Sequence, residues 1–526
     1  MHSPFAHLLH TNHVPSESEI HQIEAFLLDD ETTRLWALID DLADRRKVVA
    51  EIVDTHRALL SPFRRLPNDI VQEIFVACLP TEHNATMSAA QAPLLLGRVC
   101  RSWRTFAHSV PLLWSTLHIP IGMTYGRGAV REMPPRLFPG LHSAVDIWLD
   151  RSRACPLSLS VTSYPDVSAV SAPFLEHLMA WSRRWKSLKL KGGRSLDDFL
   201  AVPRIQEQFP ILENLVIHHS AETPREAARW DLLRAPGLRN VTLTVKITNP
   251  LELPPPWEQL VYLDLECEAP WPWGANVGGS GLSVDAAVQL LQKCHRLEVC
   301  SLHVSQQLGA IFASSTTAQL TFLRSLWLFQ THCARHLLDR LMMPNLRDFG
   351  LRRHARIQGI ATQGLFNPIA NDPPSLEILD MFLNALTDDS LTDTLRLFPS
   401  LFELRLTGFY VPGDLDSQQL PLEGAVLDDT ILGLLTPDPS SPDYLCPVLD
   451  FVVFRTMSTL SDNALLKFIE RRAASAHPLK SVYVQFSRPM EWDILLSLEP
   501  YISAGLDVEI RYVIPEYDGA RYSPTI

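Results

Sequence analysis

Residues 185–190 read WKSLKL, and the same order of residues, apolar-x-x-apolar-x-apolar, returns along the chain up to residue 484. There are eleven such phrases: WKSLKL, LENLVI, LRNVTL, LVYLDL, LEVCSL, LRSLWL, LRDFGL, LEILDM, LFELRL, LDFVVF and LKSVYV. They begin at residues 185, 212, 238, 260, 297, 323, 346, 376, 401, 449 and 479. The last two apolar positions of each phrase are two residues apart, so on a strand they share one face. The sequence therefore predicts a ladder of parallel strands.

Helical patterns lie between these phrases, such as SVDAAVQLLQKC at 283–294 and SDNALLKFIERR at 461–472, and several open with a capping Ser or Asp. One strand and one helix cannot bury their apolar faces alone, so neighbouring units must stack. Most steps between phrases fall in the range of 20–29 residues found in leucine-rich repeats, which the chain resembles without their regular Asn. We predict an α/β fold whose main part, residues 141–512, is a leucine-rich-repeat-like horseshoe with a parallel sheet. A doubly wound domain is the alternative, and eleven phrases of one type argue against it.

The N-terminal region has a different pattern. Residues 1–15 are expected to be a disordered tail, and Ser16 with Glu19 has the spacing of a capping box at a helix start. We expect a long amphipathic helix over residues 16–62. Its heptad seam consists of Leu35, Leu38, Leu42, Arg45, Val49, Ile52, His56 and Leu59. This seam could form a coiled coil with a second copy of the protein, or it could lie along the next domain.

An ordered set of residues follows the long helix: Leu-Pro, an acidic residue, Ile-Val, Ile-Phe, then Val-Cys-Arg-x-Trp and Leu-Trp-x-x-Leu. Its members are Leu66, Pro67, Asp69, Ile70, Val71, Ile74, Phe75, Val99, Cys100, Arg101, Trp103, Leu113, Trp114 and Leu117. This combination resembles an F-box, and the flanking segments resemble F-box proteins of mushroom-forming fungi. The resemblance implies a three-helix module over residues 63–120. A linker at 121–140 and a tail at 513–526 complete the expected organisation, and the insert at 81–93 is longer than usual.

The resemblance also implies a function. An F-box docks on the Skp-type adaptor of a cullin-based SCF ubiquitin ligase, and the solenoid would then bind the protein to be ubiquitinated, without catalysis by this chain. The residues expected to contact the adaptor are Leu66, Pro67, Ile70, Val71, Ile74, Phe75, Val99, Cys100, Trp103, Leu113 and Trp114. A three-helix unit is too small to bury all these apolar groups internally. The alternative function is a scaffold without catalytic activity that self-associates through residues 16–62.

The residue between the two strand leucines of each phrase faces away from the core, so these residues form one row across the inner face. The row is Lys189, Val216, Thr242, Asp264, Ser301, Trp327, Gly350, Asp380, Arg405, Val453 and Tyr483. The candidates for binding a partner protein are Trp327, Asp380, Arg405 and Tyr483, because aromatic residues and arginine dominate protein interfaces. A solvated face with a single stray tryptophan is the alternative interpretation.

Composition excludes several other functions. The net charge of −13 disfavours nucleic acid as a partner, and no apolar run approaches the length that crosses a bilayer. We expect no cofactor and no metal, because the usual phosphate loop, dinucleotide fingerprint and nucleophile elbow do not occur. The set Cys294, His295, Cys300 and His303 is interpreted as core thiol and surface imidazoles. The eight scattered cysteines suit a reducing compartment, so we expect the cytoplasm or the nucleus.

Overall fold

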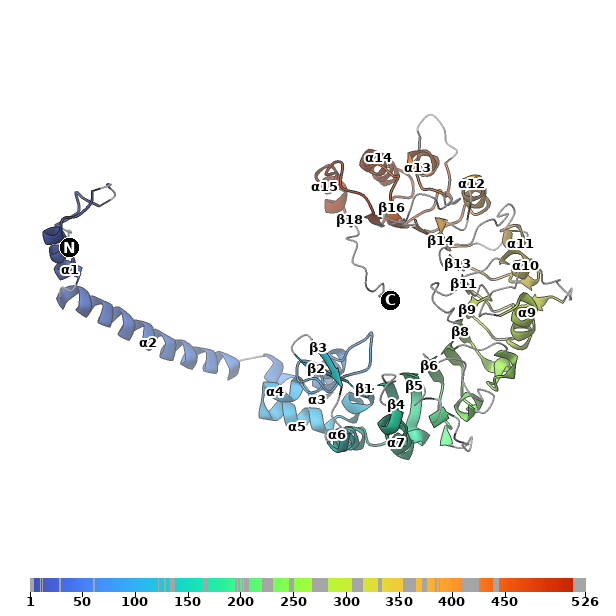
Figure 1. The fold of residues 1–526 in the computed structure, drawn as a ribbon, viewed down its shortest axis with the longest axis horizontal. Coiled ribbons are helices and arrows are strands. Elements are labelled where there is room, and N and C mark those ends of the chain that lie inside the picture. The colour runs from blue at the N-terminus through green and yellow to red at the C-terminus, as the bar shows by residue number, and fades with distance from the viewer. Residues whose placement is uncertain are drawn as a thin grey trace. The chain divides into compact units, whose positions relative to one another are not determined.

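The computed structural model divides the 526-residue chain into two compact units, Met1–Cys78 and Leu79–Ile526 (Figure 1). The structure describes residues 4–9, 11, 13–27, 30–59, 62–121, 123–126, 129–132, 138–163, 168–193, 196, 199–200, 202, 208–219, 230–245, 250–266, 282–304, 316–329, 334–352, 366–370, 376–383, 386, 388–408, 425–438 and 444–513. The division at Cys78 falls inside the module expected at 63–120, whose first helix therefore belongs to the first unit.

The first unit is helical. It contains α1 (Glu17–Leu27), α2 (Asp30–Leu59), a short 3-10 turn η1 (Pro62–Arg65) and α3 (Asn68–Ala77). The capping box is formed as expected, because the Glu19 carboxylate accepts hydrogen bonds from the Ser16 amide at 2.8 Å and the Ser16 hydroxyl at 2.7 Å. These bonds from Ser16, with a smaller effect of His13, lower the pKa of Glu19 to about 2. The single helix expected over 16–62 is thus two helices, and residues 28–29 between them lie outside the described part.

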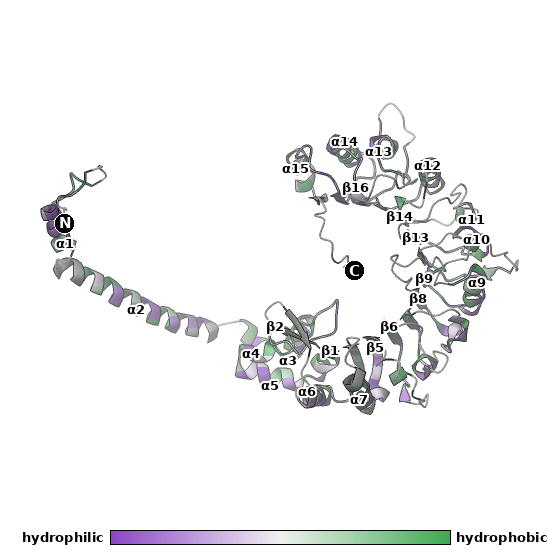
Figure 2. Ribbon diagram, viewed as in Figure 1, coloured by the Kyte–Doolittle hydropathy of each residue, from purple (hydrophilic) through white to green (hydrophobic). Residues whose placement is uncertain are grey.

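Hydrophobic and hydrophilic residues are interspersed along the coloured part of α2 (Figure 2). Every described side chain of this helix is exposed, including apolar ones such as Leu35 and Val49. Packing inside the first unit therefore leaves the seam of α2 uncovered.

The second unit is built on one fourteen-stranded sheet. Each strand of this sheet pairs in parallel with the strand of the sheet that follows it along the chain. Its strands, in spatial order, are β1 (Thr116–Ile121), β4 (Leu157–Ser163), β5 (Trp185–Gly192), β6 (Asn214–His219), β7 (Asn240–Thr244), β8 (Tyr262–Glu266), β9 (Val299–His303), β11 (Ser325–Phe329), β13 (Asp348–Arg352), β14 (Ile378–Phe382), β15 (Glu403–Thr407), β16 (Phe451–Met457), β17 (Ser481–Phe486) and β18 (Asp507–Tyr512). Each of the eleven phrases ends in one of these strands. The second unit is therefore an α/β, leucine-rich-repeat-like solenoid, as predicted.

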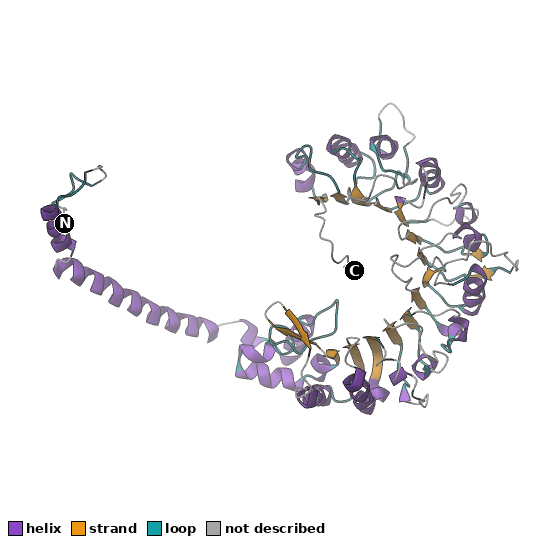
Figure 3. Ribbon diagram, viewed as in Figure 1, coloured by secondary structure: helices purple, strands orange, loops and turns teal. Residues whose placement is uncertain are grey.

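Within the second unit the strands line the inner side of a curve and the helices lie outside it (Figure 3). The α-helices are α4 (Leu96–Val99), α5 (Arg101–Ser109), α6 (Phe138–Arg151), α7 (Ser168–Leu178), α9 (Val284–Lys293), α10 (Ala334–Leu338), α11 (Asn367–Ala370), α12 (Asp388–Leu397), α13 (Asp429–Leu435), α14 (Asp462–Ala473) and α15 (Leu495–Ser503). The buried apolar residues of the strands, mostly Leu, Val and Phe, and the buried residues of the helices form the core of the solenoid.

Other connections are shorter than an α-helix. The 3-10 turns are η2 (Pro111–Trp114), η4 (Met179–Arg184), η7 (Asp231–Arg234), η8 (Pro250–Glu252) and η9 (Trp257–Gln259). Three consecutive prolines at 254–256 interrupt the connection into β8, and proline lacks the N–H that a helix interior needs. Two small sheets complete the unit: antiparallel β2 (Met123–Gly126) with β3 (Ala129–Glu132), and parallel β10 (Ala318–Gln319) with β12 (Leu341–Met342).

The start of the solenoid differs from expectation. Residues 116–120 were expected to close the helical module, but they form most of β1, the first strand of the large sheet. The region expected as a linker, 121–140, holds the β2–β3 hairpin and the beginning of α6. The insert at 81–93 also has a structural role, because His118 of β1 donates its amide to the Ala85 carbonyl at 2.7 Å and pairs with Thr86 in a parallel bridge. The insert thus protects the edge of β1 from pairing with other chains.

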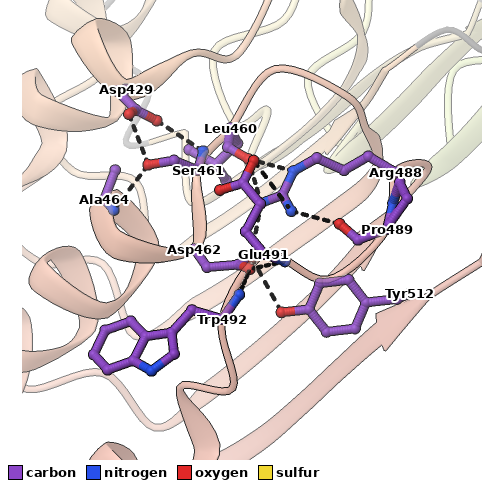
Figure 4. Close-up of polar contacts among 10 residues, drawn as sticks. All are labelled: Asp429, Leu460, Ser461, Asp462, Ala464, Arg488, Pro489, Glu491, Trp492 and Tyr512. Atoms are coloured by element: carbon purple, nitrogen blue, oxygen red, sulfur yellow. Dashed lines mark hydrogen bonds and ion pairs between the residues drawn. The ribbon is translucent and has the colours of Figure 1, made fainter.

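The other end of the solenoid is held by a buried carboxylate, Asp462, at the start of α14 (Figure 4). One oxygen accepts from the Arg488 guanidinium at 2.7 Å and from the Tyr512 hydroxyl at 3.1 Å. The other accepts from the amides of Glu491 and Trp492 at 2.8 and 2.9 Å. Burial alone raises the pKa of Asp462, but the bonds from Arg488 and the two amides outweigh it, and the pKa lies below its ordinary value. The network joins α14, the segment after β17 and strand β18.

A second buried ionic group, Arg472, lies near the end of α14. Its side chain is fully buried and donates to the carbonyls of Leu435, Cys446 and Leu445, each at 2.8 Å. The guanidinium also lies 4.8 Å from the ring centroid of Tyr444. Burial lowers the pKa of Arg472 to about 10, so the group remains charged at neutral pH. It fastens α14 to the chain segment before β16.

Candidate functional site

The inner face of the solenoid carries one row of residues, one from each strand of the large sheet. The pairing register makes the row His118, Ser160, Lys189, Val216, Thr242, Asp264, Ser301, Trp327, Gly350, Asp380, Arg405, Val453, Tyr483 and Glu509. The eleven positions predicted from the phrases are all present in their predicted order. The structure adds two positions before them and one after, from strands β1, β4 and β18.

The largest side chain of this row is Trp327, which is half-buried on β11. Its indole lies across Gly350 on the neighbouring strand, because a Cβ added at Gly350 would stand 2.0 Å from Cε3 of the tryptophan. The absence of a side chain at Gly350 therefore makes the space that the indole occupies. A flat aromatic ring on a polar face is a suitable platform for an apolar or cationic group of a partner.

A charged group, Arg405, lies three strands further along the row. The Arg405 guanidinium donates to the Glu403 carboxylate at 2.6 Å. Burial alone lowers the pKa of Arg405, but the bond to Glu403 and the charges of Asp380 and Asp348 raise it above its ordinary value. Arg405 is thus a fixed positive charge among three carboxylates, with about a third of its side chain exposed.

The predicted partner-binding residues of the inner face have different accessibility. Trp327, Arg405 and Tyr483 are partly exposed, and the Tyr483 ring lies 5.7 Å from the guanidinium of Arg511 on β18. Asp380, by contrast, is only 1% exposed. It lies between Gly350 and Arg405 in the sheet, and its charge raises the pKa of Arg405. Its role as a contact residue stays a prediction.

The residues predicted to contact an adaptor also divide into exposed and buried groups. On α3, Ile70 and Ile74 are 44% and 37% exposed, whereas Val71 and Phe75 are buried. Ile70 and Ile74 are four residues apart and so share one face of the helix. Pro67 at the start of this helix is exposed, and Leu66 is half-buried. Helix α3 therefore exposes a short apolar strip formed by Ile70 and Ile74.

The second group lies in the second unit. Val99 is 57% exposed, Cys100 is exposed and Trp103 is half-buried. Leu95 and Leu112, each 44% exposed, are further apolar surface residues of this region that were not predicted. The sequence offered a signal for Leu95, since it lies in the run LLL at 94–96, of which a four-residue helix can bury only part.

Leu113 and Trp114 are buried, and their role as contact residues stays a prediction. The Trp114 indole N–H donates to the Ala107 carbonyl at 2.8 Å, and its ring meets Trp148 edge-to-face with centroids 4.8 Å apart. The Arg151 guanidinium lies 4.5 Å from the Trp114 ring centroid. Trp114 therefore joins α5 to α6 inside the second unit.

No described part of the chain gathers three or more metal-ligating side chains into a possible metal site. Cys294 and Cys300 are buried, and burial raises the pKa of Cys294 to about 12 and that of Cys300 well above its ordinary value. The interpretation as core thiols therefore holds, and His295 is exposed as expected, but His303 is buried rather than on the surface. Within the described ranges, no helix is both long and apolar enough to span a bilayer.

Comparison with known proteins gives little further information. The chain matches no protein-family model and no curated protein. A solved structure described as "Crystal structure of Rad7 and Elc1 complex in yeast" is similar to 79% of this chain and 98% of that chain, with 14% sequence identity and a TM-score of 0.31. A TM-score this low does not establish a common fold, so the class of the second unit follows from its own parallel ladder.

Proposed function

We propose that this protein is a substrate-recognition adaptor of an SCF-type, cullin-based ubiquitin ligase. The F-box-like region, residues 63–120, would dock on a Skp-type adaptor, and the inner face of the solenoid would hold the protein to be ubiquitinated. The observation that carries the proposal is the exposed apolar strip of Ile70 and Ile74, on the helix that begins with the Leu-Pro of the F-box pattern.

Two properties support docking by this strip. Isoleucine side chains left 44% and 37% exposed on one helix face gain hydrophobic stabilisation when a partner covers them. The buried residues of the same helix, Val71 and Phe75, hold α3 in place, so the strip is preorganised. Val99 and Cys100, which follow the F-box pattern in the second unit, are proposed as further contacts.

The test is binding of the full chain to a purified Skp-type adaptor, measured by calorimetry. Ile70→Glu with Ile74→Glu should weaken binding at least roughly a hundredfold, because two charges would have to be buried at the centre of an apolar interface. The matched control is Leu495→Glu with Leu496→Glu, which alters two exposed apolar residues on α15. Wild-type affinity of the Ile70/Ile74 variant would show that α3 does not dock the adaptor, and an equal loss in the control would show that the effect is unspecific.

The receptor role of the solenoid rests on the half-buried indole of Trp327 and the fixed charge of Arg405. Proteins that co-purify with the full chain should include a set that is lost with Trp327→Ala and Arg405→Ala but kept with Ile70→Glu and Ile74→Glu. The Skp-type adaptor should show the opposite pattern. A single set lost in both variants would contradict the separation of the two surfaces.

A further inference from the structure

Helix α2 carries an apolar seam that its own unit leaves uncovered and that takes no part in the proposed adaptor docking. The seam residues Leu35, Leu38, Leu42, Val49 and Ile52 are between 51% and 57% exposed. They recur at intervals of three, four and seven residues, which are the a and d positions of a heptad. Ile39, Val48 and Val53, at the adjacent e and g positions, are 53%, 56% and 40% exposed and widen the seam.

Charged residues flanking this seam distinguish between possible arrangements of two copies. In a parallel, in-register pair, a g residue faces the e residue five positions further along the other copy. Asp41 then faces Arg46 of the second copy, and this opposite-charge contact occurs twice because of the two-fold symmetry. Val48 faces Val53 in the same way, which continues the apolar contact.

Antiparallel pairs bring g residues against g residues and e residues against e residues. In the overlaps that keep the apolar a and d layers matched, Asp41 faces Val48, Thr55 or a second Asp41. Arg46 faces Ile39 or a second Arg46. Those arrangements place Asp41 and Arg46 against apolar groups or against like charges. The parallel pair also sets Arg34 against Ile39, so the preference for it rests on the Asp41–Arg46 contact.

The polar seam position Arg45 fits the same arrangement. In a parallel pair two Arg45 residues meet at a d layer, which costs stability but penalises shifted registers. The Arg45 guanidinium already lies 2.9 Å from the Asp41 carboxylate of its own helix. Asp41 therefore lies between its own Arg45 and Arg46 of the second copy, and offsets positive charge at this layer.

We propose that the protein forms a homodimer through a parallel, in-register coiled coil of α2, with Asp41 of each copy paired to Arg46 of the other. The partner for this surface is thus a second copy of the same chain. The inference is independent of the adaptor function, since it uses no residue of α3 or of the solenoid.

The experiment is sedimentation of the full chain over a concentration series. Wild type should be a dimer, and Leu42→Glu with Val49→Glu should be a monomer that still binds the Skp-type adaptor. Asp41→Arg and Arg46→Asp should each weaken the dimer by roughly tenfold, and the double exchange should restore it. The matched control exchanges Asp54 and Arg57, an ion pair at 3.6 Å on the side of the helix away from the seam, and should leave the dimer unchanged.

The direction of the helices is tested by oxidation. Leu38→Cys should form a covalent dimer with itself above the background from the native cysteines, because equal d positions meet only in a parallel pair. Cross-linking only between separate Leu38→Cys and Val49→Cys chains would instead show an antiparallel pair and overturn the proposal. A monomeric wild type at all concentrations would overturn it as well, and would leave the adaptor docking to be judged by its own binding assay.

Discussion

Replacing Asp462 by asparagine should loosen the C-terminal end of the solenoid. The carboxylate is 1% exposed and accepts four hydrogen bonds, two of them from backbone amides. Asparagine keeps the shape but turns one acceptor oxygen into a donor, so either the amides of Glu491 and Trp492 or the Arg488 and Tyr512 donors lose their partner. Breaking a buried pair of this kind costs about 3–5 kcal/mol.

The assay is hydrogen exchange of the full chain, because a repeat array need not unfold in one step. A loss of about 3 kcal/mol corresponds to exchange roughly a hundredfold faster, confined to strands β17 and β18 and the segment between them. Asp507→Asn on β18 is the matched control, since this exposed carboxylate accepts a hydrogen bond from the Ser481 hydroxyl at 3.2 Å and is not buried. Exchange within a factor of two of wild type for Asp462→Asn would refute the reasoning.

The pH dependence gives an independent check on the same residue. The folded pKa of Asp462 lies below its ordinary value of 3.8, so its stabilising contribution is complete well above that value. As the pH falls through 3.8 toward the folded pKa, the unfolded chain takes up the proton first and the contribution is lost. The difference between wild type and Asp462→Asn should therefore be constant from neutral pH to about pH 5 and should shrink below it.

Three further substitutions test other parts of the second unit. Gly350→Ala should cost about 1–3 kcal/mol in urea unfolding because its Cβ would collide with the Trp327 ring, and Trp327→Ala in the same chain should remove most of that cost. Arg472→Met leaves three buried carbonyls without their donor and should cost about 3 kcal/mol; a loss below about 1 kcal/mol would contradict this role. Trp114→Phe removes the bond to the Ala107 carbonyl but keeps the ring contact, so its thermal unfolding should show a loss near 1 kcal/mol.

The inner row could be predicted from sequence because the strand period fixes which residues share a face. The buried leucines on either side of Trp327, Leu326 and Leu328, identify the orientation of the residue between them, and the same rule applies at each repeat. Strand β1 was missed because it contains Pro120 and lacks the full phrase. The proline is tolerated because β1 is the edge strand of the sheet: it pairs with one strand, β4, and its other side meets the insert at 81–93.

Accessibility was less predictable than orientation. Asp380 faces the same side of the sheet as Trp327 and Arg405, yet it is buried. The exposure of a residue on the inner face depends on the size of the side chains around it. Trp114 and Leu113 have the apolar character of interface residues, but their contacts lie with α5 and α6, which are distant positions that no local pattern specifies. A sequence motif identifies the residues of a module, but it does not show which of them are buried in the core of that module.

The one-residue-per-strand row has an evolutionary consequence. In each repeat of the eleven phrases the row residue lies between two buried apolar residues, so a mutation at that position changes the inner face while the core keeps its packing. Single substitutions in the row can therefore change the partner that is bound, and whole repeat units can be exchanged between related proteins. The architecture lends itself to rapid diversification of specificity on an unchanging backbone.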